Sequence, residues 1–184
     1  MVDKKEKSVE EVQIPAGVTI TIDAKSFVKA IGPKGEAKKQ LRSVDISFVV
    51  KGNVVEIISK KSSRKELKVL YAFVAHVKNL IKGVTKGFVY KLKVCSGHFP
   101  ITAAVKGNEF IVKNLFGEAL PRVLKIKEGV KVTVTAAIVE VTGTNLEIVS
   151  QVSADIENLV RRTDYDRRVF QDGIYITDKD GDLM

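Results

Sequence analysis

Alternation of apolar and polar residues predicts a series of short strands in the first third of the chain. A residue pair of glycine and asparagine, Gly52-Asn53, is typical of a tight turn and predicts that the strands on either side form a hairpin. A second turn is predicted at Gly32–Gly35, where glycine and proline supply the required backbone angles. The strands predicted around these turns are Val18–Ile22, Phe27–Ile31, Ala37–Leu41, Val44–Val50 and Val54–Ile58.

A helix is predicted after these strands. Ser63 and Glu66 have the spacing of a capping box, in which each side chain bonds the other residue's backbone N–H. Gly83 is expected to end the helix. Two apolar stripes lie side by side on it, so we expect the helix to be covered on most sides. These stripes comprise Leu67, Leu70, Tyr71, Val74, Val77 and Ile81, and Val69, Phe73, His76 and Leu80.

The second half of the chain passes through similar steps. Gly117-Glu118 follows Gly35-Glu36 by 82 residues, and a second capping box at Thr144–Glu147 begins another amphipathic helix. The apolar face of that helix holds Val149, Val152, Ile156 and Leu159. The strands predicted before it are Phe110–Lys113, Leu120–Ile126, Val130–Ala136 and Ile138–Val141. The recurrence of similar elements at a nearly constant offset indicates that the chain is an internal duplication. The alternative is that two unrelated α+β halves match by chance.

The predicted fold class is therefore α+β, with two tandem duplicated domains. Each domain is expected to be a small antiparallel β-sheet packed by one α-helix. The predicted boundaries are 1–83 for the first domain, 84–163 for the second and 164–184 for a C-terminal extension that has no counterpart in the first half.

Charge narrows the choice of partner. The 184 residues carry a net charge of +9, which favours nucleic acid or acidic membrane as a partner. No apolar run approaches the about 20 residues of a membrane-spanning helix, and the charged N-terminus lacks the pattern of a secretory signal. We therefore expect a cytoplasmic protein without a membrane partner. Up to Lys86 there are 18 basic and 9 acidic residues, but the remainder holds 13 of each.

Basic and aromatic residues alternate where the two halves meet. On a strand, Lys91 and Lys93 would share one face, and Tyr90 and Leu92 would share the other. Paired lysines on one face suit contact with RNA phosphates. A solvated outer face of the strand is an equally good explanation of this pattern.

His98 follows the single cysteine, Cys95, by three residues. A zinc site needs four ligands, and a Cys–His nucleophile needs a third orienting group, which the sequence does not mark. We therefore expect no metal, no cofactor and no catalytic residue. Cys95 is expected to pack as a small apolar residue, and His98 is a candidate for stacking on RNA.

Four arginines fall within eight residues in the segment Arg161–Arg168. Arginine forks onto phosphate and stacks on bases, so the cluster favours RNA binding. A salt-bridged surface turn is the alternative, because aspartates are interleaved with the arginines. Asp164 or Asp166 is a candidate cap for a short helix ending near Gly173.

Two segments resemble a known family. Asn79–Lys91 with His98-Phe99-Pro100, and Arg168–Ile176 followed by Lys179, are similar to the large-subunit ribosomal protein family numbered six in bacteria and nine in eukaryotes, in its archaeal and eukaryotic branch. The turn Gly32–Gly35 matches that family's first domain. Tyr165 departs from it, since the branch usually has a basic residue there.

The resemblance implies binding to large-subunit rRNA near the sarcin–ricin loop, the stalk base and the docking region of translation GTPases. Neighbouring large-subunit proteins are the expected protein partners. By resemblance, the rRNA-binding residues are Lys86, Tyr90, Lys91, Lys93, His98, Phe99, Arg167, Arg168, Phe170 and Lys179. Nearby basic residues add Arg122, Lys125, Arg161 and Arg162.

The leading hypothesis is thus a non-enzymatic structural protein of the large ribosomal subunit. Three other classes stay open at this stage. They are a free-standing RNA-binding module or chaperone, an enzyme that uses Cys95 and His98, and a protein–protein adaptor, which the charge disfavours.

Overall fold

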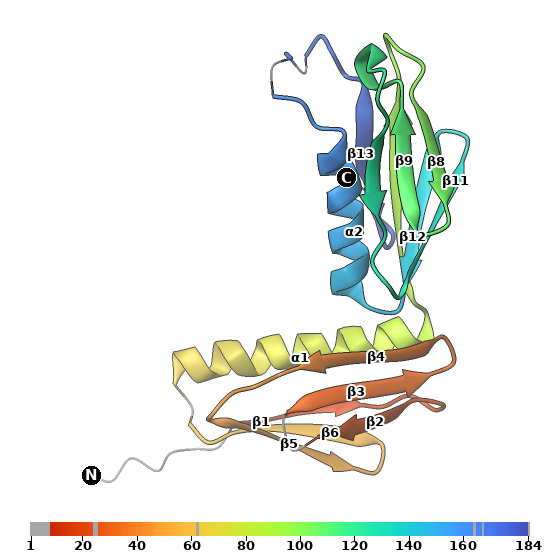
Figure 1. The fold of residues 1–184 in the computed structure, drawn as a ribbon. Coiled ribbons are helices and arrows are strands. Elements are labelled where there is room, and N and C mark those ends of the chain that lie inside the picture. The colour runs from red at the N-terminus through yellow and green to blue at the C-terminus, as the bar shows by residue number, and fades with distance from the viewer. Residues whose placement is uncertain (1–7, 24–25, 62, 164, 167, 184) are drawn as a thin grey trace. The chain divides into compact units, whose positions relative to one another are not determined.

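A computed structural model describes residues 8–23, 26–61, 63–163, 165–166 and 168–183. The chain divides into two compact units, residues 1–87 and 88–184 (Figure 1). Each unit has its own apolar core and one long helix, which confirms the predicted α+β class. No helix among the described residues is long and apolar enough to cross a membrane.

The first unit combines two three-stranded antiparallel sheets with one helix. The strands pair in the orders β1-β6-β5 and β2-β3-β4. Helix α1 contacts both sheets, and its buried residues share a core with Val28, Val55 and Ile57. The elements are β1 (Ser8–Gln13), β2 (Thr19–Ile22), β3 (Phe27–Gly32), β4 (Gly35–Gln40), β5 (Ile46–Lys51), β6 (Val54–Ser59) and α1 (Arg64–Thr85).

Both predicted turns of the first unit are confirmed. β5 and β6 form a hairpin through Gly52-Asn53, and Gly52 takes a positive φ of 57°. The turn between β3 and β4 packs against the end of α1, because Lys34 N–H donates to the Val84 carbonyl at 3.0 Å. A Cβ on Gly32 would lie 2.9 Å from Val84 Cβ, so only glycine fits this approach without displacement.

Helix α1 differs from the prediction at both ends. It begins after Ser63, but the Ser63 side chain makes no capping hydrogen bond. It also runs past Gly83, which is buried inside the last turn. Gly87 ends it instead, with a φ of 74° and a bond from its N–H to the Lys82 carbonyl. A glycine ends a helix where it adopts the left-handed conformation. Gly87 does so, four residues after Gly83.

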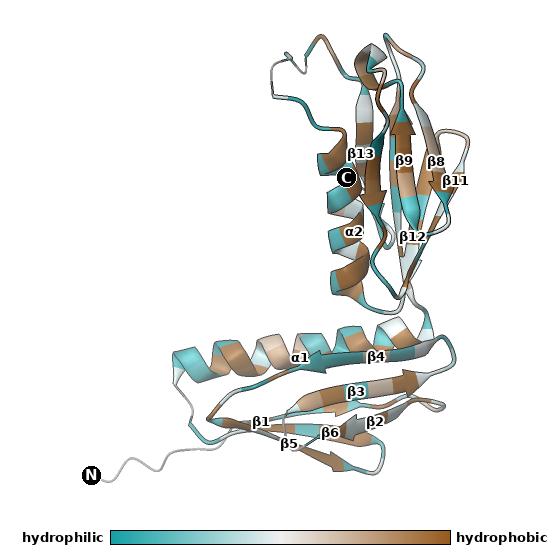
Figure 2. Cartoon of the chain, viewed as in Figure 1, coloured by the Kyte–Doolittle hydropathy of each residue, from teal (hydrophilic) through white to brown (hydrophobic). Residues whose placement is uncertain are grey.

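Both predicted apolar stripes of α1 contain exposed residues, Tyr71 in the first and Val69 in the second. Leu70, Val77 and Val84 are fully buried, whereas Val69 and Tyr71 are 38% and 56% exposed. The expectation that the helix is covered on most sides is therefore wrong. Teal and brown residues alternate along α1 in Figure 2, as expected for a helix with one buried face.

The second unit holds a five-stranded sheet, a three-stranded sheet and a helix. The five strands have the order β11-β12-β7-β13-β14, and the three have the order β10-β9-β8, with every pairing antiparallel. The elements are β7 (Phe88–Cys95), β8 (Thr102–Lys106), β9 (Glu109–Lys113), a 3-10 turn (Leu115–Gly117), β10 (Arg122–Lys125), β11 (Val130–Thr135), β12 (Ile138–Gly143), α2 (Leu146–Leu159), β13 (Gly173–Lys179) and β14 (Asp182–Leu183).

The capping residue of α2 is not the predicted one. Asn145 is the N-cap, and its side-chain oxygen accepts a 2.9 Å hydrogen bond from Glu147 N–H. The sequence pattern pointed to Thr144, one residue earlier. Both types cap helices well, so only the backbone conformation decides between them.

The two units repeat one topology, which confirms the duplication. In each, a first strand pairs with the second strand of a late hairpin: β1 with β6, and β7 with β12. A three-stranded meander lies between them in both units, and a helix follows the hairpin. Each unit thus has two sheets where the sequence predicted one.

The C-terminal segment is the main difference between the units. Strand β13 pairs with β7, and its Ile174 is fully buried in the second core. Residues beyond 172 therefore complete the sheet of the second unit. A segment that the sequence suggested as an extension is thus partly built into the fold, because its alternating isoleucines face the core.

Candidate nucleic-acid interface

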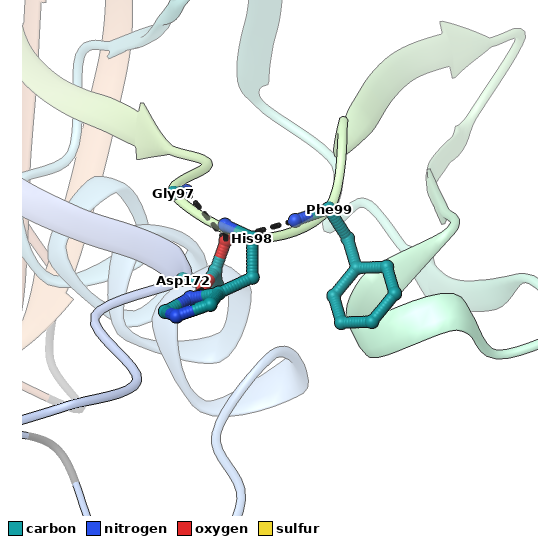
Figure 3. A network of polar contacts seen from close by, with 4 residues as sticks. All are labelled: Gly97, His98, Phe99 and Asp172. Carbon is teal, nitrogen blue, oxygen red and sulfur yellow. Dashed lines mark hydrogen bonds and ion pairs between the residues drawn. The ribbon is translucent and has the colours of Figure 1, made fainter.

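A buried carboxylate joins two loops of the second unit. Asp172 Oδ1 accepts hydrogen bonds from Gly97 N–H at 2.6 Å and His98 N–H at 2.9 Å, with Phe99 N–H at 3.5 Å. Its Oδ2 lies 2.7 Å from His98 Nδ1 (Figure 3). We call this group, Asp172 with residues 97–99, the Asp172 junction. It holds the loop after β7 against the segment that leads into β13.

The charge of Asp172 is stabilised by these donors. Burial alone would raise the pKa of this carboxyl, because its side chain is fully enclosed. The hydrogen bonds from His98, Gly97 and Phe99 outweigh burial and lower the pKa to about 2. Asp172 is therefore an acceptor only, so His98 Nδ1 donates and Nε2 is the ring nitrogen that can meet a partner.

An aromatic cluster lies beside the junction. It consists of His98, Phe99, Phe116, Tyr165 and Phe170. Tyr165 stacks on Phe116 with ring centroids 5.0 Å apart, and His98 lies 4.9 Å from Phe170. The Arg162 guanidinium sits 4.7 Å from the Tyr165 ring centroid. Aromatic rings with a guanidinium above them are the surface on which unstacked RNA bases pack.

A cavity of about 220 Å³ opens between this cluster and the end of α2. Aromatic and basic side chains line it together with two acidic ones, Glu157 and Asp172. Its lining includes Phe116, Asn158, Arg161, Arg162, Tyr165 and Phe170.

Arg122 has a structural task. Its guanidinium forks onto Glu118 at 2.9 and 2.7 Å, and its third nitrogen donates to the Leu159 carbonyl at 2.6 Å. Hydrogen bonding to Arg122 lowers the pKa of Glu118 against the raising effect of burial. The bond to Leu159 ties β10 to the last turn of α2. Arg122 is therefore a weaker candidate for RNA contact than cations without such partners.

The predicted alternation of β7 is confirmed, with consequences for three candidates. Tyr90 is 8% exposed and packs in the core, so its ring is not presented to a partner, in contrast to the prediction. Burial, followed by the charges of Asp180 and Asp182, raises its pKa. Lys91 and Lys93 lie on the opposite face of the strand.

The two lysines of β7 have different neighbours. Lys91 lies opposite Glu140 of β12 on one side and Asp178 of β13 on the other. These acids weaken its attraction for phosphate. Lys93 is exposed and lies opposite Tyr175 and Ile138, neither of which is acidic. Lys93 is therefore the stronger candidate of the pair.

The other candidates are distributed over the chain. Arg161 and Lys125 are exposed, Phe99 is 39% exposed, and Lys179 is half-buried in β13. The Arg168 side chain is 93% exposed and has only a long contact, 3.7 Å, with Asp166. Lys86 belongs to the first unit, at the end of α1. Arg167 and Asp164 lie outside the described residues.

The segment after α2 is a series of turns where the sequence allowed a short helix. The Asp166 side chain accepts a 2.9 Å bond from Arg168 N–H, as in a turn capped by its own aspartate. No helix forms among residues 161–163, 165–166 and 168–172. The proposed helix cap is therefore a turn cap.

Sequence reasoning did not single out Asp172 or Phe116. Asp172 precedes Gly173 in the tail segment, but its partners lie 73 to 75 positions earlier in the chain. Phe116 stands in a turn, where aromatic residues carry no periodic signal. No local pattern connects either residue with the loop after β7.

The suggested Cys95–His98 chemistry finds no support in the geometry. His98 Nδ1 bonds Asp172, and no contact between Cys95 and His98 is present in the part of the chain described. No cluster of three or more metal-ligand side chains occurs among the described residues.

Relatives of known identity cover almost the whole chain. Large ribosomal subunit protein uL6 of Saccharolobus solfataricus is 41% identical over 172 residues, which are 93% of this chain and 94% of that protein. The uL6 proteins of Aeropyrum pernix and Methanococcus vannielii are 42% and 37% identical over 175 residues each. These matches cover 94% and 96% of the two proteins, and 94% and 95% of this chain. The chain belongs to the uL6 family.

The sequence profile described as ribosomal protein L6 matches residues 14–87, which lie within the first unit of this uL6-family chain. The resemblance drawn from the two sequence segments is thus confirmed. Membership in this family of structural ribosomal proteins also confirms that the chain is not an enzyme.

Proposed function

We propose that this protein is a structural constituent of the large ribosomal subunit in the cytoplasm and binds large-subunit rRNA through its second unit. The proposed contact region lies near the sarcin–ricin loop and the stalk base, where translation GTPases dock. Neighbouring large-subunit proteins are the proposed protein partners. The names of the relatives support the assignment to the large subunit.

The Asp172 junction is the observation that carries the proposal. It holds together two surface segments that are far apart in sequence and that both carry RNA-binding side chains. His98 and Phe99 come from one segment, and Arg161, Arg168 and Phe170 come from the other. RNA binding benefits from such preorganisation, because less conformational entropy is lost on association.

The proposed contacts divide by chemistry. Exposed cations neutralise phosphates, and half-exposed rings stack on bases or ribose. Lys93, Arg161 and Arg168 are the strongest phosphate contacts on grounds of exposure, and His98, Phe99 and Phe170 supply rings. The further proposed contacts are Lys86, Lys91, Lys125, Arg162, Arg167 and Lys179.

A matched pair of double variants tests the proposal. Arg161→Gln/Arg168→Gln removes two charges from the proposed surface, and Lys106→Gln/Lys113→Gln removes two exposed charges from another sheet of the same unit. Binding to a large-subunit rRNA fragment is measured against salt. Each lost phosphate contact lowers the slope of log affinity against log salt by about 0.7 to 0.9. Only the arginine variant should flatten the slope, and equal slopes for both variants would refute the proposed surface.

Chemical probing of deproteinised and protein-bound large-subunit rRNA tests the location. We expect protection at the sarcin–ricin loop and the stalk base. Protection elsewhere would leave the large-subunit role intact and overturn the proposed position.

A further inference from the structure

Strand β1 forms an edge of its sheet. The order is β1-β6-β5, and no other strand among the described residues pairs with β1. Ile14 N–H donates to the Asn53 carbonyl at 2.7 Å. This bond shows which residues of β1 direct their backbone groups toward β6 and which direct them away. By that alternation, every second residue directs its backbone N–H and C=O away from β6. The outward-directed residues are Val9, Glu11 and Gln13.

A groove of about 580 Å³ runs beside this edge, between β1 and the second half of α1. Val12 and Ile81 provide its apolar part. Its charged residues are mostly basic, with Glu11 as the acidic exception: Lys78, Lys82 and Lys86 follow one another at helical spacing on α1. The groove thus combines a strand edge that no described strand covers, an apolar wall and a positive rim.

The second unit shows what occupies the corresponding edge there. β7 is the counterpart of β1, since Leu92 pairs with Val139 as Val12 pairs with Val55. The free side of β7 is filled by β13, which runs antiparallel and places Ile176 opposite Leu92. β13 also contacts α2. In one copy of the duplicated fold, therefore, a strand fills the position that is an open groove in the other.

We propose that the groove beside β1 binds an extended segment of another polypeptide, which adds to β1 as an antiparallel strand. On the face of that segment that is turned toward α1, apolar side chains pack toward Ile81 and acidic ones meet the lysines of α1, because alternate side chains of a strand share one face. A peptide fits better than RNA, because a strand edge offers alternating N–H and C=O groups that only another backbone pairs in register. This interaction lies in the first unit and shares only Lys86 with the proposed rRNA contacts.

The probe is a synthetic peptide, acetyl-Glu-Thr-Ile-Thr-Ile-Thr-Glu-amide, in which the isoleucines and glutamates share one face of the strand. It is titrated into the full-length protein and followed by amide NMR. Glu11→Pro removes one outward N–H and leaves the bonds to β6 in place. Glu11→Ala is its matched control, because it removes the same carboxylate and keeps the N–H. We expect the alanine variant to bind at least as tightly as the original protein. The proline variant should bind roughly tenfold more weakly, as expected for a lost hydrogen bond.

Two further measurements do not depend on the folding of the proline variant. Two versions of the peptide are compared, one methylated at the odd-numbered and one at the even-numbered backbone nitrogens. Only one of them should lose binding, since only one of the two sets of N–H groups faces β1. Replacing the glutamates of the peptide by lysines should weaken its binding to the original protein. The Lys78→Glu variant of the protein should bind this lysine peptide more tightly than the original protein does.

Three results would overturn the proposal. They are equal binding of the peptide by the proline and alanine variants, indifference to peptide methylation, and occupation of the groove by the rRNA fragment in place of the peptide. Glu11→Pro should not change the affinity of the second unit for rRNA. Failure of this proposal is therefore distinguishable from failure of the proposed function.

Discussion

The Asp172 junction makes a prediction about stability. Asp172→Asn keeps the shape of the side chain and removes its charge, so the four donors around it face a weaker acceptor. The amide nitrogen of asparagine also competes with His98 Nδ1 as a donor. A pKa of about 2 in place of the ordinary 3.8 corresponds to about 2 kcal/mol of stability at neutral pH. We therefore expect the second unit to lose about 2 kcal/mol.

The pH dependence follows from the direction of the pKa change. Because the pKa of Asp172 is lower in the folded protein than in the unfolded chain, its contribution is complete above about pH 4. It is lost as the pH falls toward 2, where the folded protein binds the proton. The difference between the original protein and Asp172→Asn should therefore shrink over that interval.

Urea unfolding followed by tyrosine fluorescence suits this measurement. Three of the four tyrosines belong to the second unit, and the chain has no tryptophan. Asp182→Asn is the matched control, since it removes the same charge from an exposed strand of that unit. Equal losses in both variants, or an Asp172→Asn effect that is the same at pH 7 and pH 2.5, would refute the role assigned to the junction.

Three further substitutions test the packing. Gly143→Ala places a Cβ 2.8 Å from Val149 Cγ2, and overpacking of this kind should cost about 1 to 3 kcal/mol in urea unfolding. Gly32→Ala should destabilise the first unit by a similar amount, because the Cβ would meet Val84 at 2.9 Å; thermal melts that match the original protein would contradict the close approach. Arg122→Gln should destabilise the second unit by about 1 to 3 kcal/mol and raise the pKa of its partner carboxylate, measured by NMR titration.

Strands and turns were predictable from the sequence because their causes are local. The hairpin at Gly52-Asn53 and the turn at Gly32–Gly35 follow from backbone angles that few residues other than glycine adopt. The burial of alternate residues in β7 follows from the period of two in its sequence. The duplication was visible for the same reason, since similar elements recur at a nearly constant offset.

Helix ends were predicted less well, because neighbouring residues compete for the same role. Thr144 and Asn145 both suit an N-cap, and Gly83 and Gly87 both suit a C-terminal stop. Packing decides each case. Gly83 lies on the buried face of α1, where the helix continues, and Gly87 takes the left-handed conformation as the chain enters β7.

For the candidate site, too, the sequence indicated which residue types are involved, and the structure showed which of them are accessible. Residue types and the family resemblance pointed to basic and aromatic positions, but not to which of them a partner can reach. Tyr90 is buried and Arg122 is engaged by Glu118, whereas Lys93 and Arg168 are exposed. These differences depend on residues that are distant in sequence or lie across a strand pair.

The α+β class, the repeated order of elements, the family resemblance and the excess of positive charge in the first half could all be inferred from the amino-acid sequence. The bonds of Asp172 to the loop after β7 became evident only from the folded chain. The same holds for β13, which fills an edge of one sheet, whereas no described strand covers the counterpart at β1. The physical reason is the range of the interactions. Turn geometry and periodicity act over a few residues, but strand pairing and buried hydrogen bonds join positions more than 70 residues apart.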